Sequence, residues 1–252
     1  MRIVLFANNR VGCEVLQWLV GQGEQVVGLV LHPDDTAAFK THMQTLAQSR
    51  QIPTWEPDSS QDEEFQAQIA ALQPDLLLSV SYGYRLPTAL LELPGCGAIN
   101  LHNGYLPFNR GTYANVWSIV DDTPAGATLH FMEAAFDSGD IIDRIEVQKT
   151  LDDTGASLHR KIEKASMELF ISSWPKIKTG DFQAQPQFSH EGSYHLKKDV
   201  ALIDEIDLNK MVRARDLINL LRARTFVPHE SAYCIEDGVK YYIRVSIEKE
   251  EK

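Results

Sequence analysis

The chain has 252 residues, of which 44% are hydrophobic and 23% are charged, and it contains 11 prolines and 15 glycines. This composition is typical of a globular protein that is long enough for one sizeable core and a small additional unit. The formal net charge of −11 argues against a protein that binds nucleic acid over a broad surface, because such binding requires many phosphates to be neutralised at once.

Targeting and redox features favour a cytoplasmic location. No apolar stretch approaches the roughly 20 residues of a membrane-spanning helix. The N-terminal MRIVLFANNR is more typical of a first β-strand than of a signal peptide. The cysteines Cys13, Cys96 and Cys234 lie far apart and form no CxxC or Cys/His pattern. We therefore expect reduced thiols, no metal site and no association with membranes.

The first half of the chain alternates short apolar strands with helices. Four apolar runs of strand length occupy residues 3–6, 26–31, 76–80 and 98–101. Helices are predicted over residues 12–21, 65–72 and 87–91. Strands that are apolar on both faces and alternate with helices predict a Rossmann-like α/β fold, in which helical crossovers join a mostly parallel sheet.

Later segments extend this pattern. A helix is predicted after Gly111 and through Val120, and GATLHFMEAAFDSGDIIDRIEVQ contains two strand-like runs around an acidic loop. We expect these runs to add strands to the sheet. Apolar residues then recur at helical spacing over residues 158–169, which predicts an amphipathic helix that KTGDF ends.

The polar, irregular segment QPQFSHEGSYHLKKD is predicted to separate two domains. We expect a catalytic domain over residues 1–195 and a small α+β domain over residues 196–252. In the second domain a helix is predicted over residues 214–223, followed by a hairpin with strands at 231–235 and 240–247 around EDG. An apolar two-stranded hairpin is marginally stable alone, so it needs either a docking surface on the chain or a homodimer.

The stretch AINLHNGYLPFNRG places an amide and an imidazole at the end of a predicted strand. Side chains alternate along a strand, so Asn100 and His102 face the same way, and open parallel sheets bind ligands beyond the carboxyl ends of their strands. His suits proton transfer near neutral pH, and Asn can donate a hydrogen bond to a developing oxyanion. Asp137 could orient the imidazole and stabilise its cation. An Asn-x-His pair alone, however, is more often structural than catalytic.

Three segments of this part of the chain carry a family resemblance. PDLLLSVSYGYRLP is followed by NLHNGYLPFNRG, which contains Asn-x-His and a Leu-Pro-x-x-x-Gly turn, and then by FDSGDII. In these segments the chain resembles the folate-dependent formyltransferases, over residues 2–177 and more loosely over residues 217–233. The resemblance implies the formyltransferase fold, with 10-formyltetrahydrofolate as the donor of a formyl group to an amine.

The resemblance also implies the residues of the site. Asn100, His102 and Asp137 would form the catalytic trio, in which Asn100 stabilises the oxyanion and His102 moves the proton. The pterin would lie against two groups of residues: Tyr82, Gly83, Tyr84, Arg85 and Leu86, and Ser138, Gly139 and Asp140. His130 is expected to be a supporting or core histidine, and the side chains of Tyr82 and Tyr84 could equally serve ordinary packing.

The family divides by acceptor into enzymes for methionyl-tRNA, for glycinamide ribonucleotide and for nucleotide-linked amino sugars, with a related hydrolase that uses water. The tRNA enzymes carry a larger C-terminal β-barrel and a positive surface, which this acidic chain does not match. Glycinamide ribonucleotide enzymes usually end after the catalytic domain, and the hydrolase usually has a regulatory domain before it. A folate or nucleotide binder without turnover would be expected to lack a member of the trio, and all three are present.

The loop YLPFNRGTYANVWSI is most similar to that of the sugar N-formyltransferases, so a dTDP- or GDP-linked amino deoxysugar for surface polysaccharide (lipopolysaccharide O-antigen) biosynthesis is the expected acceptor. Substrate contacts are expected from Asn9, Arg10, Asn109, Arg110, Gly111, Tyr113 and Phe226. Arg side chains and a helix start suit phosphate groups, and Phe226 could stack on a nucleobase. Each Arg could equally be a solvated surface charge, and Phe226 could pack the small domain.

Overall fold

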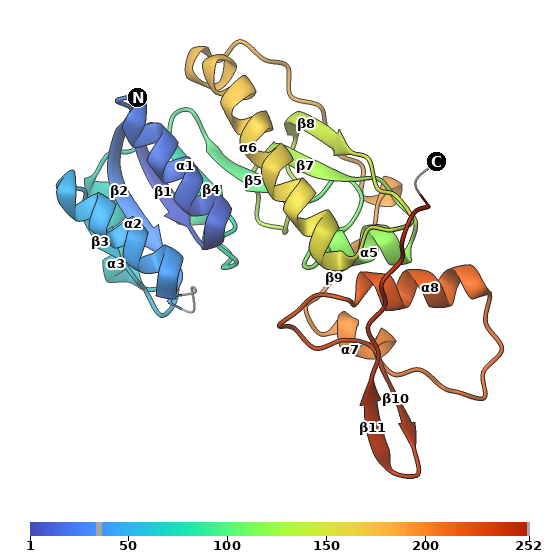
Figure 1. The fold of residues 1–252 in the computed structure, drawn as a ribbon. Coiled ribbons are helices and arrows are strands. Elements are labelled where there is room, and N and C mark those ends of the chain that lie inside the picture. Colours follow the sequence, from blue (N-terminus) through green and yellow to red (C-terminus); the bar gives the residue numbers. More distant parts are fainter. Residues whose placement is uncertain (34–36, 251–252) are drawn as a thin grey trace.

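The computed structural model of the protein describes residues 1–33 and 37–250. Its centre is a seven-stranded sheet with the strand order β3-β2-β1-β4-β5-β7-β8 (Figure 1). The strands are β1 (Arg2–Ala7), β2 (Gln25–Leu31), β3 (Thr54–Trp55), β4 (Leu76–Val80), β5 (Ala98–His102), β7 (Ala125–Phe131) and β8 (Ile141–Val147). The strands from β3 to β5 are parallel, whereas β7 runs antiparallel to both of its neighbours. The predicted mostly parallel α/β sheet is therefore confirmed.

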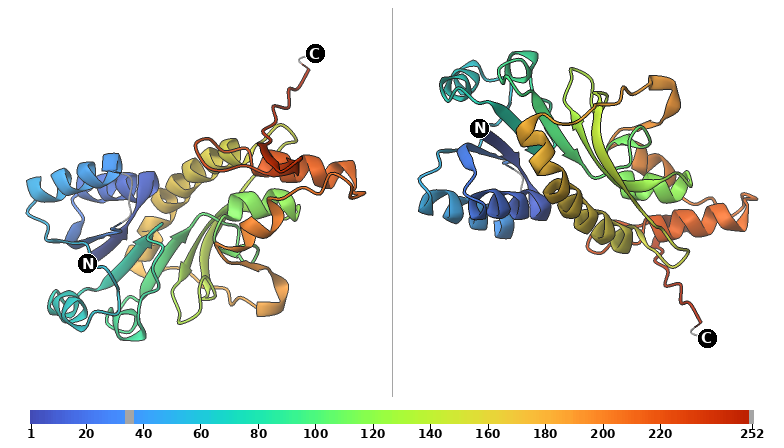
Figure 2. Two further views of the ribbon diagram at one scale, coloured as in Figure 1. Left: turned by 90° about the horizontal axis from the view of Figure 1, so that it is seen from below. Right: turned by 90° about the horizontal axis from the view of Figure 1, so that it is seen from above.

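Helices cover both faces of this sheet (Figure 2). They are α1 (Asn9–Gly21), α2 (Ala37–Ser49), α3 (Glu63–Ala71), α4 (Thr88–Leu91) and α6 (Gly155–Thr179). α1, α2 and α6 pack on one face, around Leu5, Leu78 and Phe170. α3 and α4 pack on the other face, around Phe6 and Leu77. Successive strand residues are thus buried on opposite faces, which is why the strands are continuous apolar runs in the sequence.

Capping residues account for the ends of two of these helices. α1 begins after Asn8, whose side chain accepts a hydrogen bond from the amide of Asn9. α6 begins with a capping box formed by Thr154 and Ser157, and it ends at Gly180, whose φ is 72°. Glycine adopts this left-handed conformation without strain, so the helix end predicted at KTGDF is confirmed.

Most elements predicted in the first half of the chain agree with the structure to within a few residues, but α2 and β3 had no prediction. Met43 and Ala47 of α2 are fully buried. They lie one helical turn apart, so a narrow stripe of this helix faces the core and its apolar periodicity is weak. Among the described helices, none combines the length and the apolar character that crossing a bilayer requires.

Shorter elements complete the chain. They are β6 (Arg110–Gly111), α5 (Ala114–Val120), η1 (Ser189–Glu191), β9 (Tyr194–His195), α7 (Asp199–Ile203), α8 (Ala214–Ala223), β10 (Tyr233–Glu236) and β11 (Val239–Tyr242). α8 packs against α5 and α6. Its buried Arg222 donates hydrogen bonds of 2.9 Å to the carbonyl oxygens of Thr150 and Asp153, which join the C-terminal part of the chain to the start of α6.

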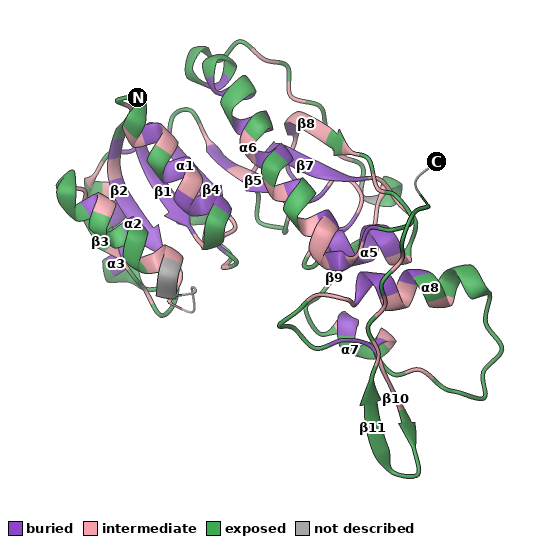
Figure 3. Cartoon of the chain, in the orientation of Figure 1, coloured by how far each residue is buried: buried purple, intermediate pink, exposed green. Residues whose placement is uncertain are grey.

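The β10–β11 hairpin projects from the rest of the protein, and most of its surface is exposed (Figures 1 and 3). Asp237 and Gly238 at its turn have φ values of 50° and 77°. Two consecutive positive values are typical of a type I′ turn, so the hairpin predicted from EDG is confirmed. Its strands are four residues each, shorter than the sequence analysis expected.

Candidate active site

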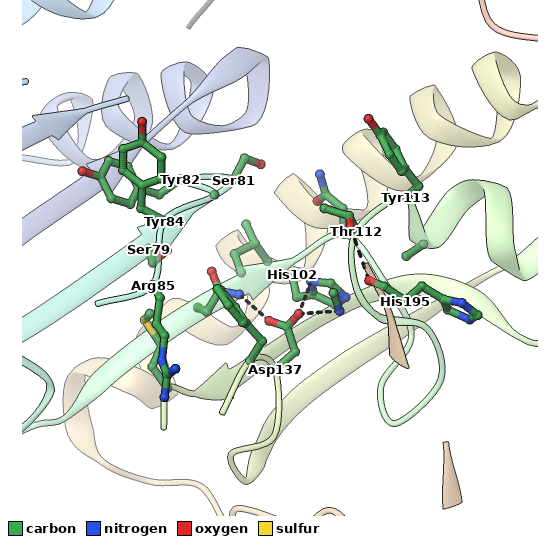
Figure 4. Close-up of a pocket in the computed structure, with 18 of the residues that line it drawn as sticks. Ser79, Ser81, Tyr82, Tyr84, Arg85, His102, Thr112, Tyr113, Asp137 and His195 are labelled. Carbon is green, nitrogen blue, oxygen red and sulfur yellow. Dashed lines mark hydrogen bonds and ion pairs between the residues drawn. The ribbon is translucent and has the colours of Figure 1, made fainter. Parts of the chain in front are cut away.

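A cavity of about 530 Å³ opens at the carboxyl ends of β1, β4 and β5. Its wall includes Asn9 after β1, Ser81 after β4, and Asn100 and His102 at the end of β5. Figure 4 shows the side chains of this wall gathered around His102 and Asp137. Open α/β sheets bind their ligands at this edge, so the cavity is the candidate active site.

The predicted trio comes together in this cavity. Nδ1 of His102 lies 3.6 Å from Oδ2 of Asp137, and Nδ2 of Asn100 donates a hydrogen bond of 3.3 Å to Oδ1 of the same carboxylate. The backbone N–H of Gly111 donates to Oδ2 at 2.9 Å. Since the side chain of Asp137 is only 10% exposed, these donors compensate for the burial of its charge.

His130 is a fourth polar group of the site, and it lies opposite Asn100 in the β5–β7 pair. Its Nδ1 donates to the carbonyl oxygen of Phe131 at 2.7 Å, which leaves Nε2 to face the site. This Nε2 accepts a hydrogen bond of 3.1 Å from Nδ2 of Asn100 and lies 3.4 Å from Oδ1 of Asp137. His130 therefore orients the amide of Asn100.

The other edge of the His102 ring is buried without a hydrogen bond. Its Nε2 atom has no partner among the described residues. The backbone of Gly104 approaches this edge closely, because a Cβ atom at that position would lie 2.5 Å from Nε2. Gly104, which the sequence analysis did not single out, therefore lets the backbone pack against this edge of the ring.

Burial and charge set the protonation of His102 and Asp137. Burial lowers the pKa of His102, an effect that the charge of Asp137 opposes and the neighbouring His130 reinforces. Burial alone would raise the pKa of Asp137, but the two histidines and the N–H of Gly111 outweigh it and hold that pKa below its ordinary value. At neutral pH the site therefore combines a neutral imidazole with an ionised carboxylate.

This arrangement can remove a proton from a nucleophile while it stabilises a negatively charged oxygen. When Nδ1–H of His102 faces Asp137, the lone pair of Nε2 is a base, and the carboxylate stabilises the cation that forms. Asn100 has its amide N–H groups at the cavity wall, where they can donate to a carbonyl oxygen that gains charge. The site fits the transfer of a carbonyl-containing group to a neutral amine.

The segment expected to contact folate runs along one side of the cavity. Its residues Tyr82, Gly83, Tyr84, Arg85 and Leu86 all line the wall. The ring of Tyr82 is buried, with its centroid 5.2 Å from that of Phe6, and burial raises the pKa of its hydroxyl. The packing role considered for this side chain is therefore present in the structure.

The acidic loop contributes Asp137 to the cavity wall, whereas Ser138, Gly139 and Asp140 lie behind it. The side chain of Gln187 holds this loop by donating to the carbonyl oxygens of Asp137 at 3.1 Å and Gly139 at 2.6 Å. A Cβ atom on Gly139 would lie 2.1 Å from the carbonyl oxygen of Phe131, so the loop packs directly on β7. Contact between folate and these three residues stays a prediction.

Some of the expected substrate contacts lie in the cavity wall, and Arg10 does not. Asn9, Gly111 and Tyr113 line the cavity. Arg10 is on the exposed surface of α1, where its Nε forms an ion pair of 2.8 Å with Oε1 of Glu14. Arg10 and Glu14 lie one helical turn apart. Their ion pair corresponds to the alternative that the sequence analysis left open, in which Arg10 is a surface charge.

Asn109, Arg110 and Phe226 also lie outside the wall. Asn109 is buried, and its amide donates to Oγ1 of Thr123 at 2.7 Å. Arg110 is buried, and its Nε donates to a backbone carbonyl oxygen at 3.3 Å. The ring of Phe226 packs against that of His159, with 5.3 Å between centroids. These side chains make their contacts within the protein. The structure therefore does not place them in the cavity wall, where the sequence analysis had expected them.

Several residues that line the cavity were not predicted. They are Thr112, His159, Tyr194, His195, Leu196 and Lys197. The last four belong to the polar segment that was expected to be only a connection between domains. Two aromatic rings and two adjacent lysines in SYHLKK are an unusual composition for a linker, and they are the signal that could have revealed this contribution.

Two family models match the chain. One, described as formyl transferase, matches residues 1–173, and the other, described as the N-formyltransferase dimerization C-terminal domain, matches residues 199–249. Among curated proteins, a methionyl-tRNA formyltransferase of Pseudomonas putida (strain W619) is 31% identical over 227 residues, which are 85% of this chain and 73% of the relative.

Solved structures of formyltransferases are similar over most of the chain. A 4-N formyltransferase from Francisella tularensis is 26% identical with a TM-score of 0.82, covering 98% of each chain. The formyltransferase PseJ from Anoxybacillus kamchatkensis, solved with UDP-4,6-dideoxy-4-formamido-L-AltNAc and tetrahydrofolate, is 25% identical with a TM-score of 0.60. That similarity covers 80% of this chain and 89% of PseJ.

The lowered pKa of His102 predicts a pH-dependent contribution to stability. The unfolded chain regains the ordinary value of about 6.5, so below that pH it binds a proton that the folded protein excludes. The free energy of unfolding of the wild type, relative to that of His102→Gln, should therefore fall as the pH is lowered from about 8 to about 5. Urea unfolding of both proteins, with NMR titration of His102, measures this. A difference that does not change with pH, or an NMR pKa at the ordinary value, would contradict it.

Proposed function

The chain belongs to the formyl transferase family, and we propose that this formyltransferase transfers the formyl group of 10-formyltetrahydrofolate to the amino group of a nucleotide-linked amino deoxysugar. The observation that carries the proposal is the convergence of Asn100, His102 and Asp137 in one cavity. The likeness to a 4-N formyltransferase over 98% of each chain supports formyl transfer to a nitrogen atom. PseJ, whose structure contains a UDP-sugar and tetrahydrofolate, supports both substrate classes. Surface polysaccharide biosynthesis is the proposed use of the product.

In the proposed reaction His102 is the base. The folate supplies a formyl carbon that a neutral amine can attack. The neutral ring of His102 accepts the proton that the amine loses, and the ionised Asp137 stabilises the resulting imidazolium. The same ring can then return the proton to the folate nitrogen that leaves, so charge and protons balance over one turnover.

Asn100 serves the oxygen of the transferred group. Its amide donates to His130 and Asp137 in the structure, which fixes the direction of both N–H bonds before a substrate arrives. A formyl oxygen that gains negative charge at the wall would accept one of these N–H groups in place of a protein partner. The amide is held at the wall before the substrate arrives, so only this exchange of hydrogen-bond partner is needed, and this is the catalytic advantage we assign to the pair Asn100–His130.

We assign one side of the cavity to each of the two proposed substrates. On one side, Arg85 and the main chain of residues 82–86 would hold the folate. On the other side, the exposed rings of Tyr113 and Tyr194 could contact a nucleobase, and Lys197 is an exposed lysine of the wall that could bind a diphosphate. We propose that the nucleotide of the sugar substrate occupies this second side.

Methionyl-tRNA is the second candidate acceptor, because curated relatives with this activity are about 30% identical to the chain. The net charge of −11 does not favour it, since contact with a tRNA backbone requires several phosphates to be neutralised. PseJ, which was solved with a UDP-linked sugar, is similar over 80% of this chain. We therefore rank the sugar nucleotide first.

We also propose that two copies of the chain associate through the β10–β11 hairpin. The matching family model for residues 199–249 is described as a dimerization domain. Four large apolar side chains of the hairpin are about half exposed: Ile235, Val239, Tyr241 and Tyr242. A two-stranded hairpin with such a surface gains stability when a second copy covers it.

The proposed reaction is tested with 10-formyltetrahydrofolate and a panel of dTDP-, UDP- and GDP-linked amino sugars, followed by mass spectrometry. One sugar nucleotide should gain the mass of a formyl group. Asn100→Ala should lower kcat by about 10²–10³, and His102→Gln by about 10²–10⁴. His42→Gln is the matched control, because His42 pairs with Gln17 on the exposed surface and does not line the cavity. Formylation of methionyl-tRNA with no product from the panel would exclude the sugar acceptor.

Lys197→Ala tests the side of the cavity assigned to the nucleotide. Loss of a charged contact to a diphosphate should raise the KM for the sugar nucleotide by about 10- to 100-fold, with the KM for folate unchanged. Lys198→Ala is the control, because this neighbouring lysine is also exposed and does not line the cavity. Equal effects of the two substitutions, or none, would show that Lys197 does not bind the diphosphate.

Light scattering coupled to gel filtration tests the proposed dimer. The double variant Val239→Asp/Tyr241→Asp places two charges on one face of the hairpin and should convert a dimer to a monomer, because burying unpaired charges is costly. Leu93→Asp makes the same kind of change on an exposed leucine outside the hairpin and should leave the dimer intact. A wild-type monomer at micromolar concentration would refute the assembly.

A further inference from the structure

Residues 192–195, which we call the connecting segment, lie directly beside the loop that follows β5. The amide of Arg110 donates to the carbonyl oxygen of Ser193 at 3.0 Å, and the amide of Thr112 donates to that of His195 at 3.0 Å. These bonds form the parallel pair β6–β9. The connecting segment precedes α7 and α8, so the chain touches the active-site loop on its way to the C-terminal helices.

Side chains add to this backbone pairing. Oγ of Ser193 accepts a hydrogen bond from the amide of Asn109 and donates one to Oδ1 of the same residue, both at 3.0 Å. The ring of His195 stacks on that of Trp117, with 4.0 Å between centroids and 6° between planes. Its Nε2 lies 3.2 Å from Oδ2 of Asp121. The connecting segment is therefore anchored to both the loop and α5.

Gly192 allows the closest of these approaches. Its φ and ψ are −142° and −172°, an extended conformation that any residue can adopt. A Cβ atom at this position would nevertheless lie 1.8 Å from the carbonyl oxygen of Pro107. A side chain at residue 192 would therefore force the connecting segment and the loop apart, even though the backbone conformation itself does not require glycine.

The paired loop carries the donor that the catalytic carboxylate uses. The amides of Arg110 and Thr112 both point to the connecting segment, whereas that of Gly111, whose φ is 90°, points the other way. It donates to Oδ2 of Asp137 at 2.9 Å, the same oxygen that faces His102. The direction of this N–H group is thus set by the two hydrogen bonds on either side of it.

We propose that the connecting segment is a positioning element of the active site: its pairing with the loop aims the N–H of Gly111 at Asp137 and so holds the carboxylate against His102. Gly192 and Ser193 are then positioning residues that touch neither substrate nor the reacting atoms. This inference rests on the proposed formyl transfer for its kinetic measurement, but its effect on the carboxylate can be measured without turnover.

Loosening the connecting segment has a defined electrostatic consequence. The groups that face Asp137 are His102 from β5, His130 from β7, the amide of Asn100 and the N–H of Gly111. If the N–H of Gly111 turns away, Asp137 loses a donor and its own pKa rises, and the carboxylate is no longer held against His102. The cation of His102 then loses electrostatic support, so the pKa of His102 falls further.

The decisive comparison is Gly192→Ala with Gly95→Ala as the matched control, since a Cβ atom on the exposed Gly95 would meet no atom within 4 Å. Gly192→Ala should keep its fold by circular dichroism and lower kcat about 10- to 100-fold, with the KM for folate within about twofold of the wild type. The acid limb of its rate profile and the NMR pKa of His102 should both move to lower pH. A folded Gly192→Ala variant with the wild-type kcat and pKa would overturn the proposal.

A second pair of variants keeps the test decisive if Gly192→Ala does not fold. Ser193→Ala removes both bonds to Asn109 and should show the same changes to a smaller extent, whereas Ser193→Thr retains the hydroxyl and should restore them. If Ser193→Ala behaves as the wild type in kcat and in the pKa of His102, the proposal fails. If the pKa shifts but no sugar nucleotide is formylated by the wild type, the proposed acceptor fails and the positioning role stands.

Discussion

The active site is organised around one buried carboxylate. Asp137 is almost removed from solvent, and a charge in such a place is tolerated only where donors surround it. Those donors come from separate parts of the chain, Asn100 in β5 and the loop amide of Gly111. The rings of His102 in β5 and His130 in β7 lie 3.6 Å and 3.4 Å from the same carboxylate. The need to satisfy this charge explains why a loop, two strands and the connecting segment converge at one edge of the sheet.

The two histidines near Asp137 have different tasks because their hydrogen bonds differ. His130 uses Nδ1–H on a backbone carbonyl oxygen, so its remaining nitrogen accepts from Asn100 and the ring acts as a support. His102 has no hydrogen bond at Nε2, and burial keeps the ring neutral, so it is available as a base. Oδ1 of Asp137 thus accepts a hydrogen bond from the amide of Asn100, whereas Oδ2 faces the ring of His102.

The segment that leads to the C-terminal helices contributes to the wall of the cavity. Tyr194, His195 and Lys197 line the cavity, and the helices and hairpin that follow correspond to a family domain described as a dimerization domain. Sequence relatives include methionyl-tRNA formyltransferases, while structural likeness over nearly the whole chain is to a 4-N formyltransferase. In the proposed reaction the trio acts on the formyl group and the walls bind the acceptor, so a shared core with different walls is consistent with both similarities.

The sequence by itself determined the features that depend on local patterns. Apolar runs specified the parallel strands, the two-residue period placed Asn100 and His102 on one face, and EDG specified the hairpin turn. Tertiary structure alone decided which side chains reach the cavity. Arg10 pairs with Glu14, and Asn109 bonds to Ser193, which is 84 residues away. Residues 194–197, which were expected to be part of a linker, line the cavity for the same reason. Contacts between distant segments depend on how the elements pack, and local sequence patterns do not predict that packing.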